Sequence, residues 1–164
     1  MKNVAMALLT AALLASSAAW AQQKDAIELK TSAQVEVVKK NEKGDKTVTF
    51  VDAAKESKVP GDVVLFTTTY TNTGKQPADA VVITNPVPEH TVYIAESAAG
   101  ANTRIDFSVD GGKTYAAPDK LTLKDKNNIT RKAAAADYTH IRWTLTKSLP
   151  AGGSGSVSYK AKIK

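Results

Sequence analysis

Apolar and polar residues alternate along most of the chain beyond residue 26, which is the pattern of a β-strand with one buried face. The longest run begins at Ile27, and every second residue from there to Val37 is apolar or a threonine. One apolar face and one polar face favour antiparallel sheets that meet water on one side. Shorter runs of the same kind lie at residues 47–50, 104–109, 140–145 and 157–163.

The segment from Pro60 to Pro88 reads as a turn, a long strand, a tight turn, a second strand and a proline stop. Threonine, valine and aromatic residues dominate its strands, as β-propensity expects. Within it, we expect Leu65 or Phe66, and then Val81 or Ile83, to face the core. Its residues suit backbone geometry and packing rather than catalysis.

Turn signals separate the runs at short intervals, and Asp110-Gly111-Gly112 is the strongest because glycine supplies the positive φ of tight hairpins. This spacing predicts an all-β fold, an Ig-like antiparallel two-sheet β-sandwich of the Greek-key type. At most one short helical turn is expected, near residues 132–138. The predicted core includes Phe66, Ile83, Phe107, Trp143 and Tyr159.

The first 21 residues have the features of a signal peptide: Lys2, an apolar run from Val4 to Leu14, and the small-x-small sequence Ala19-Trp20-Ala21. We expect cleavage after Ala21 and export to the periplasm, the cell surface or the medium. The rest divides into an N-terminal strand segment at residues 22–45, a candidate for exchange between copies, and a sandwich domain at residues 46–164.

Composition narrows the range of partners. The chain has no cysteine, so neither a disulfide nor a thiolate-bound metal is available. Its net charge of +6 comes mostly from scattered lysines. Nucleic-acid binders cluster such charges among aromatic residues, so we expect no nucleic-acid partner. Beyond the signal peptide no segment is apolar enough to span a membrane.

No group of residues predicts catalysis, a cofactor or a metal. His90 and His140 fall on different predicted elements, whereas zinc usually takes three or four nitrogen or sulfur ligands. Ser154-Gly-Ser156 leads into a strand and lacks the setting of a nucleophile. The aspartates do not have the spacing of a calcium loop. We therefore expect no enzyme activity and no small-molecule ligand.

The segment from Ser108 to Tyr115 resembles an Asp-box hairpin, Ser-x-Asp-x-Gly-x-Thr-aromatic. That resemblance implies a structural role, in which Ser108, Asp110 and Thr114 bond across the turn and Tyr115 packs beneath it. A single copy in a chain of this length does not make a propeller. The predicted hairpin residues are Ser108, Asp110, Gly111, Gly112, Thr114 and Tyr115.

A second resemblance covers most of the chain. The Pro-Gly-Asp turn at residues 60–62, the strand that ends Tyr-Thr-Asn-Thr-Gly at residue 74 and the run at residues 78–88 resemble a bacterial family. The family is catalogued as domain of unknown function eleven. The resemblance continues through residues 93–100, 107–115, 138–145 and 149–159. It implies an Ig-like exported module of surface or envelope proteins, with no catalytic residues to transfer.

Three functions follow as alternatives. The first is a non-catalytic structural or adhesive module of the bacterial envelope or surface, with protein partners. The second is a self-assembling filament or biofilm-matrix subunit that donates residues 27–37 to the open sheet edge of another copy. In that case Ile27, Leu29, Val35 and Val37 form the assembly strand; otherwise residues 27–37 are the first strand of the chain's own domain. The third is a periplasmic ligand-binding or adaptor protein.

Overall fold

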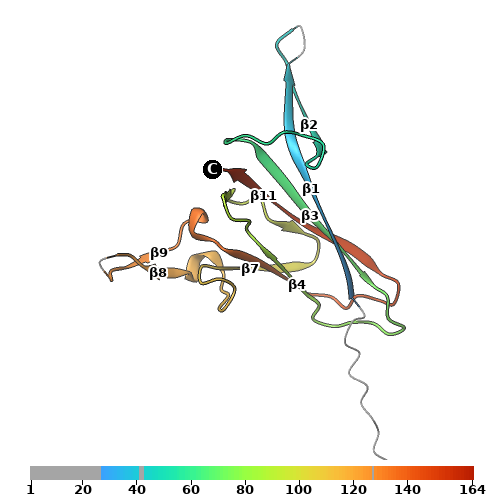
Figure 1. Cartoon of the computed structure of the whole chain (residues 1–164). Helices are drawn as coiled ribbons and strands as arrows, with labels where there is room; N and C mark the ends of the chain where they lie inside the picture. Colours follow the sequence, from blue (N-terminus) through green and yellow to red (C-terminus); the bar gives the residue numbers. More distant parts are fainter. Residues whose placement is uncertain (1–26, 41–42, 127) are drawn as a thin grey trace, which may run out of the picture.

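The computed structural model describes residues 27–40, 43–126 and 128–164, so the predicted signal peptide lies outside the described residues (Figure 1). The described chain is almost entirely β-structure. Its elements are β1 (Ile27–Lys40), β2 (Lys46–Asp52), β3 (Val63–Asn72), β4 (Val82–Pro86), β5 (Thr91–Tyr93), β6 (Ala99–Gly100), β7 (Thr103–Ser108), η1 (Pro118–Lys120), β8 (Thr122–Lys124), β9 (Thr130–Lys132), η2 (Ala135–Asp137), β10 (His140–Leu145) and β11 (Ser154–Ile163).

Two antiparallel sheets pack face to face. The larger has the order β2-β1-β3-β11-β5, with β6 also paired to β11, and the smaller has the order β4-β10-β7. A separate hairpin pairs β8 with β9. Strands distant in sequence become neighbours because the chain crosses from one sheet to the other: β3, for instance, lies between β1 and β11. The predicted all-β antiparallel sandwich is confirmed.

One detail of that prediction is wrong. The sequence predicts at most one helical turn, near residues 132–138; η2 lies there, but η1 is a second turn at Pro118–Lys120. Pro118 explains it: the proline ring fixes φ near the helical value, and its missing amide costs nothing at the start of a turn. Both turns are of the 3-10 type and span three residues each.

The core lies between the sheets and is built largely of aromatic rings. Trp143 in β10 and Tyr159 in β11 are among the most deeply buried side chains, with ring centres 6.2 Å apart. Tyr159 also stacks on Phe66 at 5.0 Å. Ile83 and Phe107 are buried as well, whereas Phe66 is partly buried against the same cluster. All five predicted core residues therefore lie at this centre.

Polar side chains are buried on the inner face of β3. Asn85 of β4 donates from Nδ2 to Oγ1 of Thr68 at 2.8 Å, and Thr68 is also 2.9 Å from Oγ1 of Thr31. These bonds satisfy hydroxyl and amide groups that would otherwise be costly to bury. They also place β4 directly over β3. The next position outward in the smaller sheet, over β1, has no strand in the described chain.

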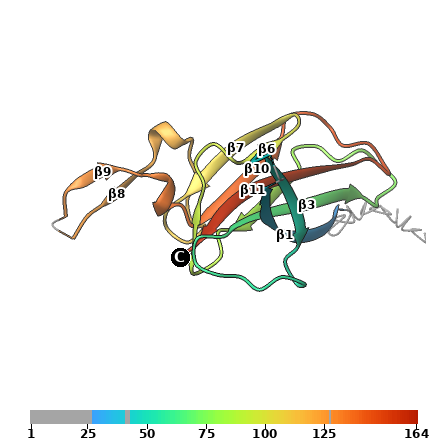
Figure 2. The ribbon, with the colours of Figure 1, turned by 90° about the horizontal axis from the view of Figure 1, so that it is seen from above.

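Two hairpin arms project from the sandwich in different directions (Figures 1 and 2). The first joins β1 and β2: β1 pairs with β3 from Ile27 to Val35, then continues to Lys40 with β2 as its partner. The second consists of β8 and β9. Each arm lies beyond the cover of the facing sheet, so its side chains are largely exposed.

Candidate functional site

The turn after β7 is held by side-chain hydrogen bonds centred on Asp110. Its Oδ1 accepts from Oγ of Ser108 at 2.7 Å and from the amides of Lys113 and Thr114, each at 3.0 Å. Its Oδ2 accepts from Oγ1 of Thr114 at 2.6 Å. Oγ of Ser108 accepts from the amide of Gly112 at 2.9 Å. The carboxylate is therefore used to hold a turn, which is the role that the Asp-box resemblance implies.

The remaining hairpin residues lie where that role requires them. Gly111 and Gly112 have φ angles of 77° and 84°, which glycine adopts without strain. A Cβ on Gly112 would come within 3.0 Å of the Tyr115 hydroxyl, so the ring lies against this part of the turn. The centre of the Tyr115 ring also lies 4.3 Å from the guanidinium carbon of Arg142. The hairpin is thus anchored on the outer face of β10.

The Asp110 carboxylate gives the hairpin a testable pH dependence. Hydrogen bonds from the hydroxyl and then the amide of Thr114 hold the pKa of Asp110 well below its usual range. A depressed folded-state pKa adds stability above about pH 4, where the unfolded carboxyl ionises, and this stability is lost as pH falls through the lower folded value. We expect Asp110→Asn to lower the melting temperature at neutral pH, by an amount that shrinks in acid.

Thermal melts followed by circular dichroism across that pH range measure the difference between variant and parent. Asp79→Asn is the matched control, because it removes a carboxylate from an exposed loop residue that makes no side-chain hydrogen bond in the described chain. A difference for Asp110→Asn that stays constant down to about pH 2 would contradict the assignment.

Asp106 is a second carboxylate engaged in structure. It is buried in β7, and its Oδ2 accepts from Nε of Arg104 at 3.1 Å and from a terminal nitrogen of Arg142 at 3.2 Å. Two guanidinium groups compensate the buried charge, which would be costly if it were alone. This arrangement stabilises the outer face of the smaller sheet and offers no free acid or base.

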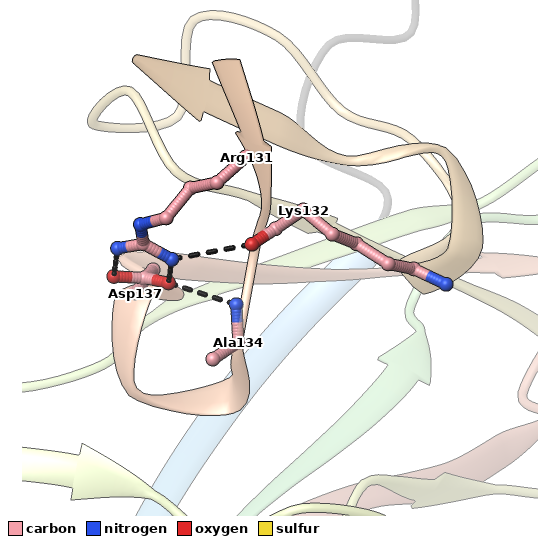
Figure 3. A network of polar contacts seen from close by, with 4 residues as sticks. All are labelled: Arg131, Lys132, Ala134 and Asp137. Carbon is pink, nitrogen blue, oxygen red and sulfur yellow. Dashed lines mark hydrogen bonds and ion pairs between the residues drawn. The ribbon is translucent and has the colours of Figure 1, made fainter. Parts of the chain in front are cut away.

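The base of the β8–β9 arm is fixed by an arginine fork (Figure 3). Two guanidinium nitrogens of Arg131 donate to the two carboxylate oxygens of Asp137, each at 2.8 Å. Asp137 also accepts from the amide of Ala134 at 2.8 Å. The hydrogen bonds from Arg131 lower the pKa of Asp137, and those to Asp137 raise the pKa of Arg131. The pair ties β9 to η2 and orients the arm.

A hollow of about 410 Å³ lies at one side of the sandwich, with an aromatic floor and Glu96 at its rim. The floor is made by Tyr93, Phe107 and Tyr138, with the rings of Phe107 and Tyr138 stacked at 4.4 Å. Burial, with smaller effects of Tyr93 and Asp137, raises the pKa of Tyr138. Tyr138 therefore stays neutral at physiological pH, and the hollow suits an apolar group rather than acid-base chemistry.

The two histidines lie apart from these clusters. His90 adopts a positive φ of 63° in the turn after β4, and His140 begins β10, where Nδ1 lies 3.3 Å from Oγ1 of Thr139. Across the described ranges, no group of three or more histidine, aspartate or glutamate side chains is placed to hold a metal ion. Nor does any helix among the described residues have the length and apolarity needed to cross a membrane.

The predicted assembly strand is part of the larger sheet. β1 pairs with β3 at nine positions and with β2 at seven, so the predicted boundary at residue 46 separates two strands of one sheet. Val35 is buried, Ile27 and Val37 are partly buried, and Leu29 is 47 % exposed. Leu29 lies on the inner face of β1, and its exposure follows from the vacant position beyond β4.

The sequence analysis missed a free strand edge on the first arm. β2 pairs with β1 on one side and forms the outer edge of the larger sheet on the other. Three apolar side chains share the outer face of this arm: Val38 and Val48, each 50 % exposed, and Phe50, 37 % exposed. The alternation at residues 47–50 predicted a strand, but a period of two cannot show that both faces stay uncovered.

Comparison with known proteins identifies no relative of the chain. No protein-family model, no curated protein and no solved structure matches the chain.

Proposed function

We propose that the chain is a non-catalytic exported module with a structural or adhesive role, acting through contacts with other proteins. The observation that carries this proposal is the pair of arms that project from the sandwich (Figures 1 and 2). Projecting hairpins expose backbone edges and side chains to partners, and such edges are common sites of protein recognition.

The arrangement of charged groups supports the same proposal. Asp106, Asp110 and Asp137 accept two or more hydrogen bonds each, and these bonds hold turns and strands in place. A general base or nucleophile needs a partner that activates it within a site open to substrate. The carboxylates with the most hydrogen bonds are instead committed to the scaffold.

Fractionation of the native cell tests the proposal. We expect the chain with a C-terminal tag to be recovered outside the cytoplasm, and its deletion to reduce surface attachment or matrix retention. The matched control lacks residues 1–21 and should stay inside the cell. Cytoplasmic recovery of the full chain, or turnover of ester or glycoside substrates by the purified protein, would overturn the proposal.

A self-assembling filament or matrix subunit is the second candidate, favoured by the free edges of β2 and β4. In the form predicted from sequence, residues 27–37 are donated to another copy. That exchange requires β1 to leave β3 at nine paired positions. The arm already stands clear of the sandwich, so it offers a route to self-association that leaves β1 in place.

A further inference from the structure

The outer edge of β2 presents unpaired backbone groups. The amide of Ala53 donates to the carbonyl of Ala33, and in an antiparallel ladder the residues that face the partner strand alternate. Residues 47, 49 and 51 therefore direct their backbone groups toward β1. Lys46, Val48, Phe50 and Asp52 direct theirs away from it, to the side where no strand of the described chain lies. At the end of this edge the carbonyl of Asp52 accepts from the amide of Lys55 at 2.9 Å, so the unpaired groups are mainly those of Lys46, Val48 and Phe50.

This edge lacks the usual protection against pairing. Natural edge strands are blunted by proline, bulges, short length or inward-pointing charges. β4, a terminal strand of the smaller sheet, spans five residues and ends in Pro86. β2 spans seven residues, and its interior sequence, Thr-Val-Thr-Phe-Val, has no charge, proline or glycine. Such a segment is well suited to pairing with another strand.

The sequence of β2 is self-complementary about Thr49. When two copies pair antiparallel with Thr49 opposite Thr49, Lys46 of each faces Asp52 of the other. The same register places Val48 opposite Phe50. All four outward-facing residues then meet outward-facing residues, so the register matches the alternation of an antiparallel ladder. The two Val48–Phe50 pairs carry the full exchange of backbone hydrogen bonds, because the carbonyl of Asp52 already accepts from Lys55. Shifting the register by two residues in either direction loses one of these pairs and separates the charges.

We propose that β2 is a homodimerisation edge, whose partner is the β2 strand of a second copy in the register centred on Thr49. The contact is isologous, as expected for a two-fold dimer, because both copies use the same patch. It joins two β1–β2 arms into one four-stranded sheet. Charge complementarity favours a second copy as the partner, because Lys46 and Asp52 are both exposed and lie at opposite ends of the edge.

The pairing also covers the apolar outer face of the arm. Val38 lies opposite Val48 within one copy, and Glu36 lies opposite Phe50. In the dimer, Val38, Val48 and Phe50 of the second copy lie side by side across three adjacent strands. By symmetry, Val38 and Val48 of the second copy lie beside Phe50 of the first. Side chains directly across adjacent strands are close enough to pack. Six apolar side chains that are exposed in the single chain become one cluster.

Thr49→Cys tests both the contact and its register. In the proposed dimer Thr49 is a non-hydrogen-bonded pair on the two-fold axis, with Cα atoms about 4.5 Å apart, within the range of a disulfide. The chain contains no cysteine, so the introduced thiol is unique. Under mild oxidation we expect Thr49→Cys to form a covalent dimer on non-reducing gels, at a yield that falls on dilution below the dimer's dissociation constant.

Thr47→Cys is the matched control on the same exposed face. In the proposed register its two copies are offset by four residues, about 13 Å along the strands, which is too far for a disulfide. Equal cross-linking of both variants, or none for Thr49→Cys at high concentration with folding intact by circular dichroism, overturns the proposal.

Charge reversal gives an independent test by sedimentation velocity. Lys46→Asp places two acidic groups together at each end of the interface, so the dissociation constant of the variant dimer should be at least tenfold higher than that of the parent, which corresponds to about 1.4 kcal/mol. Adding Asp52→Lys should restore association. Lys39→Asp, an equal charge change on the other face of the arm, should leave it unaltered. If the double variant stays monomeric while folded, the charge pairing is wrong.

This inference rests on the proposed structural role and names a partner for it. The two are separable by experiment. A chain that is exported and supports attachment but remains monomeric by sedimentation disproves the β2 dimer and leaves the proposed function intact. A chain that is dimeric but recovered from the cytoplasm disproves the proposed function and leaves the β2 dimer intact.

Discussion

Replacing Trp143 by alanine is expected to lower the free energy of unfolding by about 3–5 kcal/mol, the cost of removing a large aromatic side chain from a packed core. Trp143 is fully buried in the central strand of the smaller sheet and contacts the Tyr159 ring. Domains of this kind are stable by about 5–15 kcal/mol in total, so the variant should lose a large part of its stability.

Urea unfolding followed by far-ultraviolet circular dichroism measures this loss, because the substitution removes Trp143, the side chain whose fluorescence would report unfolding. Trp143→Phe separates ring packing from the indole nitrogen: Nε1 is buried and has no hydrogen-bond partner in the described chain. Removing that unpaired donor offsets part of the lost volume, so Trp143→Phe should cost less than Trp143→Ala. Val82→Ala, at an exposed position of the same sheet, is the control and should change little.

The core was predictable from sequence because a period of two assigns each residue of a strand to one face. Trp143 and Ile83 follow that rule and are fully buried. The rule predicts which face of the sheet a side chain is on, but not how deeply that side chain is buried. On the inner face of β3 the side chains of Thr68 and Asn72 are completely buried, whereas Phe66 is partly exposed. Hydrogen bonds to Asn85 and to the turn after β10 make the polar burial possible.

Gly155 shows a second structural feature that the sequence alone does not predict. Its sequence context, Gly-Ser-Gly-Ser, indicates a flexible strand entry, but a Cβ at this position would lie 2.3 Å from the Tyr70 hydroxyl. Tyr70 is the residue opposite Gly155 in the β3–β11 ladder. The glycine is therefore needed for close packing of a ring against the backbone. A contact between strands 85 residues apart in sequence cannot be seen from local composition.

The proposed interaction edge was less predictable than the core, because it depends on which strand has no neighbour in the sheet. From sequence, residues 27–37 are either the first strand of this domain or a strand donated to a partner. The structure pairs that strand on both sides over part of its length, and leaves β2 with one side free. Which strand becomes an edge is a property of the whole sheet order, and the pattern of a single segment does not contain it.

Deleting residues 22–38 is expected to abolish cooperative folding. The deletion removes the partner of β3 at nine positions and most of the partner of β2, and it takes away Val35 from the small core that it forms with Ala53 and Val64. The free edge of β3 and an isolated β2 cannot satisfy their backbone groups or cover that core. We expect rapid proteolysis and no sharp thermal transition.

The matched control shortens the other arm, by replacing residues 124–130 with two glycines. That arm projects from the sandwich and pairs with itself, so its loss should leave a sharp transition. A peptide of residues 27–40 added to the truncated chain then decides between an intrinsic and a donated strand. If the truncated chain folds alone and the peptide binds it as a stable monomer, β1 is a donated strand. If the chain stays unfolded until the covalent strand is restored, β1 belongs to its own domain. Donation of residues 27–37 is then excluded as a mode of self-association, and the proposed β2 edge does not depend on it.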